Sequence, residues 1–352
     1  MTATITIAGR QIGPGLPPYV IAEMSANHNG SIDAAFRIIE EAKKAGADAI
    51  KIQTYRPDTL TIDCDRPEFR IEGGLWHGKT LYELYQWAHT PWEWHADLFA
   101  QAKAAGIVMF SSPFDETAVD LLEKLGCPAY KIASFEAVDT PLIRYVAQTK
   151  KPMIISTGLA NAAEIEDAIA AAKGGGCREL AILHCVSGYP APARDYNLRT
   201  LPDMTARFGL PVGLSDHTLG NTTAIAAVAL GACLIEKHFT LNRDGGGPDD
   251  SFSLEPGELA ALVRDARTAW EALGEVSYER KESEKGNLIF RRSLCAVKDI
   301  KKGEVFTRDN VRSIRPGYGL APKELPNILG KTAERDYERG EGVDCFWISP
   351  KT

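Results

Sequence analysis

Two histidines at the ends of neighbouring predicted strands suggest a metal site. His217 and His238 each close a short apolar run, VGLSDHT and LIEKHFT. Neighbouring strands lie about 4.8 Å apart, so two imidazoles at one height could share a divalent ion, with water and substrate in the remaining positions. The alternative is a pair of histidines that only satisfy local hydrogen bonds. Asp216 points to the opposite face by strand alternation and is not expected to be a ligand.

A second group of residues suggests the binding of an anion. Lys51 and Lys131 lie inside two other apolar runs, where an ammonium group is costly unless it has a partner. Serines stand in or just after the neighbouring runs: Ser112, Ser134, Ser156 and Ser215. Two ammonium groups and several hydroxyl donors around one cavity suit a ligand with both a phosphate and a carboxylate. A lysine that forms a Schiff base is the rival interpretation.

Two acidic residues are placed to contact a substrate. Glu23 ends the run YVIAEMS, and NHNG follows it at 27–30. A carboxylate there could hold a substrate hydroxyl or move a proton, while the asparagines could cap the next helix. Asp249 lies in the glycine-rich GGGPDD at 245–250, which suits the binding of sugar hydroxyls or forms a solvated turn.

The apolar runs that carry these residues predict a closed barrel. There are eight: 19–25, 49–55, 107–114, 129–135, 152–158, 180–186, 212–218 and 234–240. Segments with helical periodicity follow nearly every run, such as 31–46, where Ser31 is placed to cap the helix and Gly46 to end it. A βα unit repeated eight times is typical of a (β/α)8 TIM barrel. Residues 4–13 predict a hairpin that closes its lower end.

In a TIM barrel the chemistry takes place at the carboxyl ends of the strands. We therefore expect the polar residues at these ends to converge on one mouth: Glu23, Lys51, Gln53, Ser112, Lys131, Ser134, Ser156, His184, Ser187, His217 and His238. A long insertion, 56–106, follows the second strand and is rich in Trp and Tyr. Connections of that length are usually functional or separately folded, so we expect a lid over the substrate or a packing surface.

The composition points to a cytoplasmic protein that binds neither nucleic acid nor membrane. A net charge of −7 argues against a nucleic-acid binder, which would show a basic face. The chain shows no signal-peptide pattern, and no apolar run approaches the roughly 20 residues that cross a bilayer. The seven cysteines are scattered without CxxC spacing, which predicts reduced thiols. We interpret Cys185 as a small packing residue.

The chain changes character after the last predicted helix of the barrel, 255–274. The charged stretch 275–287 predicts a boundary between one domain over 1–280 and a second over 288–352. Short strand-like runs with Pro and Gly punctuation predict a compact fold there. A domain this small is only marginally stable alone, so we expect it to dock on another surface.

Taken jointly and in order, the motifs resemble the sialic acid synthase family over nearly the whole chain. They are IAEMSANHNG, GADAIKIQTY, SSPFD, YKIAS, ISTG, LHCVSGYPAP, GLSDHT, EKHFT and GPDDSFSL. The tail, KDIKKGEVFTRDNVRSIRPGYG, resembles that family's antifreeze-like (SAF, β-clip) domain. SANHNG and the insertion are most similar to the branch that makes pseudaminic acid. Ser187 departs from the neuraminic acid branch, which typically has an asparagine there.

The resemblance implies a transferase that condenses phosphoenolpyruvate with an N-acylated amino sugar and water, releasing phosphate. For the pseudaminic branch the sugar is 2,4-diacetamido-2,4,6-trideoxy-L-altrose. By motif matching, phosphoenolpyruvate would be held by Lys51, Ser112, Lys131, Ser134, Ser156, Ser187 and Ser215. The sugar would be held by Gln53, Tyr189, Asp249 and Arg315.

The resemblance further implies that His217 and His238 hold Mg²⁺, Mn²⁺ or Co²⁺. Glu23 is our candidate for the catalytic residue that holds and deprotonates the attacking water or the carbon-2 hydroxyl. Family members are described as domain-swapped homodimers, in which Arg315 would reach the sugar in the other subunit's barrel. This agrees with the small second domain's need for a docking surface.

Three alternatives accompany this interpretation. A neuraminate or legionaminate synthase would run the same chemistry on another N-acyl hexosamine. A 3-deoxy-ulosonate synthase acting on a phosphorylated sugar is disfavoured, because we find no second basic cluster for that phosphate. A carbohydrate-binding or ice-binding module is suggested only by the tail, and the polar mouth of the barrel argues against it.

Overall fold

The computed structural model describes residues 3–344 and divides into two compact units, one ending at Gly274 and one beginning at Glu275. Residues 345–352, which end the predicted second domain, lie outside the described residues. Within residues 3–344 no helix has both the length and the apolar character needed to span a bilayer. The six cysteines of this part of the chain are free thiols.

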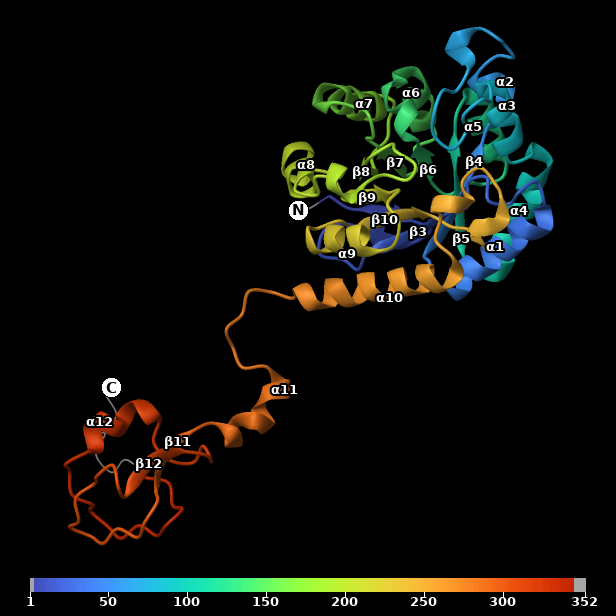
Figure 1. The fold of residues 1–352 in the computed structure, drawn as a ribbon. Helices are drawn as coiled ribbons and strands as arrows, with labels where there is room; N and C mark the ends of the chain where they lie inside the picture. The colour runs from blue at the N-terminus through green and yellow to red at the C-terminus, as the bar shows by residue number, and fades with distance from the viewer. Residues whose placement is uncertain (1–2, 345–352) are drawn as a thin grey trace. The chain divides into compact units, whose positions relative to one another are not determined.

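Eight parallel strands close into a barrel in the first unit, as the sequence predicts (Figure 1). Almost every strand residue is buried, because the interior packs on one face and the helices on the other. Parallel pairing of β10 with β3 closes the ring. Around the barrel the strands are β3 (Tyr19–Glu23), β4 (Ala49–Thr54), β5 (Val108–Pro113), β6 (Tyr130–Ile132), β7 (Met153–Ser156), β8 (Leu180–Cys185), β9 (Val212–Asp216) and β10 (Leu234–His238).

Helices surround the barrel and lie outside its strands (Figure 1). Local sequence sets their ends: the Ser31 hydroxyl accepts from the Ala34 amide at the start of α1, and Gly46 follows its end with φ +88°. Both predicted caps of this helix are confirmed. The helices are α1 (Ile32–Lys44), α4 (His95–Ala105), α5 (Glu116–Lys124), α6 (Thr140–Gln148), α7 (Ala162–Gly174), α8 (Thr200–Phe208), α9 (Thr222–Ala229) and α10 (Pro256–Leu273).

The predicted N-terminal hairpin is confirmed and packs against the barrel core. Strands β1 (Ile5–Ile7) and β2 (Arg10–Ile12) pair antiparallel, and the side chains of Ile5, Ile7 and Ile12 are fully buried. The Thr6 amide donates to Glu179, which directly precedes β8, at 2.8 Å. The hairpin therefore lies at the amino ends of the strands and leaves their carboxyl ends free for a site.

The second unit is built around a small antiparallel sheet with its own core. Strands β11 (Ser293–Ala296) and β12 (Val311–Ile314) pair along their whole length. Two short helices, α11 (Glu282–Lys285) and α12 (Leu325–Ile328), belong to the same unit. The core gathers Leu294, Ile300, Phe306 and Tyr337, among a few others. So small a core supports only marginal stability.

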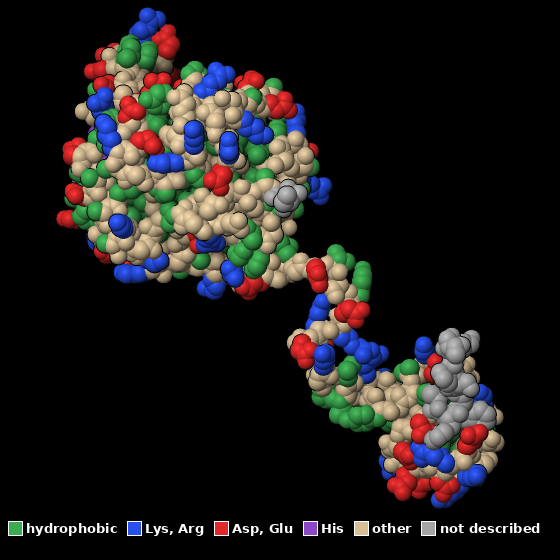
Figure 2. Space-filling view, turned by 180° about the vertical axis from the view of Figure 1, so that it is seen from behind, with side chains coloured by type: hydrophobic (Ala, Val, Ile, Leu, Met, Phe, Trp, Pro, Cys, Tyr) green, Lys and Arg blue, Asp and Glu red, His purple; other side chains and the backbone are tan. Residues whose placement is uncertain are grey.

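The surface carries charges of both signs. Figure 2 shows one face of the molecule, on which lysine and arginine side chains alternate with aspartate and glutamate over the barrel unit. A protein that binds nucleic acid through such a face would instead need a continuous basic stripe.

Candidate active site

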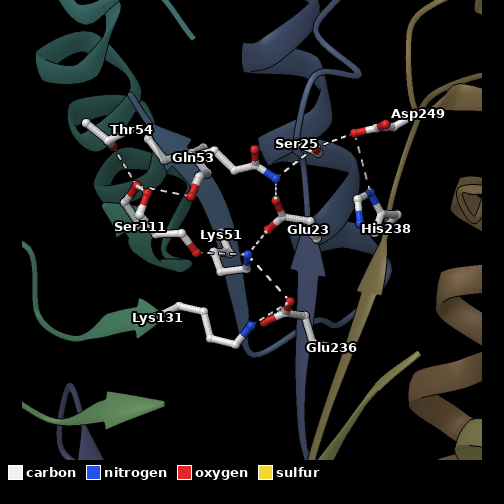
Figure 3. Close-up of polar contacts among 12 residues, drawn as sticks. Glu23, Ser25, Lys51, Gln53, Thr54, Ser111, Lys131, Glu236, His238 and Asp249 are labelled. Carbon is white, nitrogen blue, oxygen red and sulfur yellow. Dashed lines mark hydrogen bonds and ion pairs between the residues drawn. The ribbon is translucent and has the colours of Figure 1, made fainter. Parts of the chain in front are cut away.

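The carboxyl ends of the barrel strands bring four buried charges into one row (Figure 3). Glu23 Oε2 lies 2.7 Å from Lys51 Nζ, which lies 3.4 Å from Glu236 Oε1. That same oxygen lies 3.3 Å from Lys131 Nζ. Sequence reasoning found the two lysines and Glu23 but missed Glu236. The available signal was its position two residues before His238, which puts both side chains on one face of β10.

Burial and neighbouring charges set the protonation of this charged row. At Lys51, burial lowers the pKa but Glu23 and Glu236 outweigh it, so the pKa is raised. At Lys131 burial prevails over Glu236, and the pKa is lowered. Burial raises the pKa of Glu23 despite the opposing charge of Lys51. At Glu236 the two lysines outweigh burial and lower the pKa, so Glu23 is the carboxyl better suited to exchange a proton.

Serine hydroxyls surround the two lysines. Lys51 Nζ donates to Ser112 Oγ at 3.2 Å, and the hydroxyls of Ser134 and Ser187 lie 2.8 Å apart. Ser156 Oγ is buried and has no hydrogen-bond partner among the described residues, which leaves it available to a ligand. The predicted anion-binding residues all lie within or just beyond strands β4 to β9: Lys51, Ser112, Lys131, Ser134, Ser156, Ser187 and Ser215.

The two predicted metal ligands face each other beside this row. The rings of His217 and His238 have their centroids 5.4 Å apart. His217 Nδ1 donates to the Val186 carbonyl at 2.8 Å, which leaves its Nε2 without a proton. Burial lowers the pKa of His217 to about 4 and that of His238 well below its usual value. Both imidazoles are therefore neutral, as metal ligands must be.

These histidines fit a divalent ion with an incomplete protein shell. His238 Nδ1 is buried without a hydrogen-bond partner in the described part of the chain, and Asp249 Oδ2 lies 3.9 Å away. No cluster of three or more His, Cys, Asp and Glu within residues 3–344 is arranged to hold a metal. The protein would supply two nitrogens, one fewer than the three protein ligands usual in catalytic zinc sites, and substrate and water would fill the other positions.

A cavity of about 390 Å³ opens beside the charged row, and three of the four predicted sugar-binding residues line it. Gln53 Nε2 donates to Glu23 Oε1 at 3.0 Å and to Ser25 Oγ at 2.9 Å. Asp249 accepts from Ser25, and burial raises the pKa of Asp249 to about 6. The Tyr189 ring packs on His217 with a centroid distance of 4.4 Å. The fourth predicted residue, Arg315, directly follows β12 in the second unit.

Glu136 also lines this cavity, and sequence reasoning missed it. Its Oε2 is buried and lacks a hydrogen-bond partner among the described residues. Burial raises the pKa of Glu136 to about 7, so its carboxyl can either donate or accept a hydrogen bond near neutral pH. The available signal was an acidic residue just beyond a barrel strand, two positions after Ser134.

His184 does not lie in the mouth, so that prediction was wrong. It contacts the backbone carbonyl of Tyr196 outside the barrel, while the next residue, Cys185, faces inward near Lys131. Strand alternation allows only one of the two to face the interior. Burial raises the pKa of Cys185, which agrees with a packing role. Asp216 faces outward as predicted.

The insertion forms one wall of the cavity. It contains α2 (Pro57–Leu60) and α3 (Leu81–Ala88), joined by a loop that folds back over the mouth. The Trp76 indole donates to the Pro248 carbonyl at 2.9 Å, and its ring lies 5.8 Å from that of Tyr189. The part of the insertion from Leu60 to Ala88 thus borders the site, whereas α4 at its end packs beside α1 on the outside of the barrel. We call the lining side chains of the insertion the insertion wall: Leu60, Ile71, Trp76, Leu81, Leu84, Tyr85 and Ala88.

Comparisons with known proteins agree with this geometry. The chain matches the NeuB family over residues 38–278 and the SAF domain over residues 291–344. It is 46% identical over 325 residues to a pseudaminic acid synthase of Campylobacter jejuni, covering 92% of this chain and 95% of the relative. It is 44% identical over 321 residues to the pseudaminic acid synthase of Helicobacter pylori, covering 91% and 94%.

A solved structure shares the fold. The N-acetylneuraminic acid (sialic acid) synthetase of Leptospira borgpetersenii in complex with citrate superimposes with a TM-score of 0.73 and 32% identity, covering 82% of this chain and 96% of that chain. The resemblance to sialic acid synthases is thereby confirmed, and the chain belongs to the NeuB family.

Proposed function

We propose that this protein acts as a pseudaminic acid synthase. It condenses phosphoenolpyruvate with 2,4-diacetamido-2,4,6-trideoxy-L-altrose and water, giving pseudaminic acid and phosphate. The observation that carries the proposal is the position of the charged row and of the facing His217 and His238 rings beside one cavity, which Gln53 and His238 line. The cofactor is a divalent metal, Mg²⁺, Mn²⁺ or Co²⁺.

The charged row suits the phosphate and carboxylate of phosphoenolpyruvate. Glu236 Oε1 lies between the ammonium groups of Lys51 and Lys131. Lys131 has hydrogens to spare for a ligand, whereas those of Lys51 already meet Glu23, Glu236 and Ser112 and would have to exchange a partner. The surrounding serines add neutral donors, including the unpartnered Ser156 hydroxyl. In a buried site such charge-assisted hydrogen bonds are stronger than in water.

The reaction forms one C–C bond and breaks one C–O bond. Carbon 3 of phosphoenolpyruvate attacks the aldehyde of the open-chain sugar, whose oxygen takes up a proton. Carbon 2 becomes oxocarbenium-like and accepts water, and Glu23 takes the water's proton. The tetrahedral adduct then loses phosphate, and the carbon-2 hydroxyl gives up its proton to leave the keto acid. A divalent ion held by His217 and His238 would supply Lewis-acid polarisation of the aldehyde.

The substrate assignment is tested by phosphate release from phosphoenolpyruvate with a panel of sugars. The panel holds the L-altro sugar, its D-manno counterpart, N-acetyl-D-mannosamine and a phosphorylated sugar. We expect kcat/KM to be at least about tenfold higher with the L-altro sugar. Faster release with a D-manno sugar would instead identify a legionaminate or neuraminate synthase. No release with any member would reject a synthase altogether.

We also propose a domain-swapped homodimer in which Arg315 reaches the sugar in the partner subunit's barrel. The small core of the second unit favours docking on another surface. Arg315→Ala and Glu23→Gln proteins should each be nearly inactive. Mixed one to one and allowed to exchange subunits, they should recover roughly one quarter of wild-type activity, because half of the dimers then hold one intact site. Activity equal to the mean of the two parents would contradict shared sites.

A further inference from the structure

The cavity beside the charged row has two unlike faces. The barrel contributes hydrogen-bonding groups, among them Gln53, Glu136 and Asp249. The insertion contributes the insertion wall, whose side chains are carbon-rich. Leu84 is only 7% exposed, so the wall is anchored in the fold at that point.

The few polar groups of the insertion wall already have partners. The Trp76 indole donates to the Pro248 carbonyl at 2.9 Å. At Ile71 the amide donates to Lys79 at 2.9 Å and the carbonyl accepts from Gly78 at 3.0 Å. Among the described side chains of the wall, only the Tyr85 hydroxyl is left to meet a ligand. A hydroxyl pressed against the rest of the wall would lose water without gaining a partner.

The wall stands close to the two histidines at which the proposed reaction places the aldehyde of the sugar. Tyr189 packs on His217 at 4.4 Å and meets the Trp76 ring at 5.8 Å, so one aromatic ring separates the wall from the histidines. A sugar whose aldehyde lies at the histidines therefore directs its more distant carbons and acyl groups along the wall.

We propose that the insertion wall determines specificity by favouring methyl groups over hydroxyls on that distant part of the sugar. The inference rests on the proposed function. It states that residues of 56–106 distinguish a methyl group at carbon 6 of the sugar from a hydroxymethyl group. A sugar with a hydroxyl at carbon 6 would bind less well, because that hydroxyl would lose its water and find no hydrogen-bond partner on most of the wall. An apolar pocket rejects an added hydroxyl by about 100-fold at most, so we expect a preference of that order.

The test compares two sugars that differ only at carbon 6: the 2,4-diacetamido-2,4,6-trideoxy-L-altrose and its 6-hydroxy form. Ile71→Thr and Ile71→Val have nearly the same shape and differ by a hydroxyl in place of a methyl. Both keep the backbone hydrogen bonds to Gly78 and Lys79. The matched control is Ile62→Thr, because Ile62 belongs to the same insertion but is 61% exposed and outside the cavity lining.

The measured quantity is the ratio of kcat/KM for the deoxy sugar to that for the hydroxy sugar. We expect a ratio near 100 in the wild type, a similar ratio in Ile71→Val and Ile62→Thr, and a roughly tenfold lower ratio in Ile71→Thr. Equal ratios in Ile71→Thr and Ile71→Val, or an equal fall in Ile62→Thr, would overturn the role of the wall while leaving the synthase intact. No phosphate release from either sugar in the wild type would overturn the proposed function and this inference with it.

Discussion

Replacing Glu23 by glutamine is expected to lower kcat about a thousandfold while the affinity for phosphoenolpyruvate changes only a few-fold. Glutamine keeps the shape and can still meet Gln53, but it cannot take up a proton, and such transfer commonly contributes about 10²- to 10⁴-fold. Lys51 keeps an anionic partner in Glu236 at 3.4 Å, so its ammonium group stays in place. Initial rates of phosphate release and calorimetric titration with phosphoenolpyruvate measure the two quantities.

The matched control for this variant is Glu41→Gln, which removes a carboxylate on α1, outside the cavity lining, and should leave both quantities unchanged. Full activity of Glu23→Gln would remove this residue from the mechanism. A parallel loss of phosphoenolpyruvate affinity would instead show that Glu23 acts mainly by holding Lys51 in place.

The barrel was predictable because its strands follow a local rule. Each strand is buried on both faces, so runs such as LAILHCV and PMIISTG stand out from the polar helices and loops between them. Ser31 and Gly46 mark the ends of α1 by rules that involve only their neighbours. The site residues at the strand ends followed from the architecture once the strands were located.

The residues that sequence reasoning missed depend on contacts between distant segments. The position of Glu236 relative to His238 puts its side chain inside the barrel, but its pairing with Lys131, 105 positions earlier, depends on the closed barrel. The prediction for His184 was wrong because side chains alternate along β8 and Cys185 takes the inward position. A run that is apolar throughout does not show which alternate residues face the barrel interior. The insertion wall depends on how a long loop folds back over the mouth, which no local pattern describes.

The charged row explains how a barrel interior tolerates two lysines before any substrate binds. Lys51 and Lys131 share the Oε1 atom of Glu236, and Lys51 has Glu23 as a second partner. Two buried ammonium groups alone would carry a large desolvation cost, which paired carboxylates offset. The row is therefore paired before any ligand binds, and the proposed anionic substrate would meet ammonium groups that are already held in place.

Chelation of divalent ions is expected to lower phosphate release by at least about a hundredfold, because the aldehyde would lose its Lewis acid. Added Mn²⁺, Mg²⁺ or Co²⁺ should restore the rate in the wild type. The double variant His217→Ala, His238→Ala should stay inactive with any of these ions. Direct titration with Mn²⁺, followed by electron paramagnetic resonance, should show one bound ion per chain in the wild type and none in the variant.

The control for this experiment is His89→Ala, which removes a histidine outside the cavity and should retain both Mn²⁺ binding and its restoration of activity. An undiminished rate after chelation would count against any metal in the reaction. Retained Mn²⁺ binding in the double variant would place the ion elsewhere, and the unpartnered Nδ1 of His238 would then need another explanation, such as a direct hydrogen bond to the sugar. Because both imidazoles are neutral and face each other at 5.4 Å, we expect the shared ion.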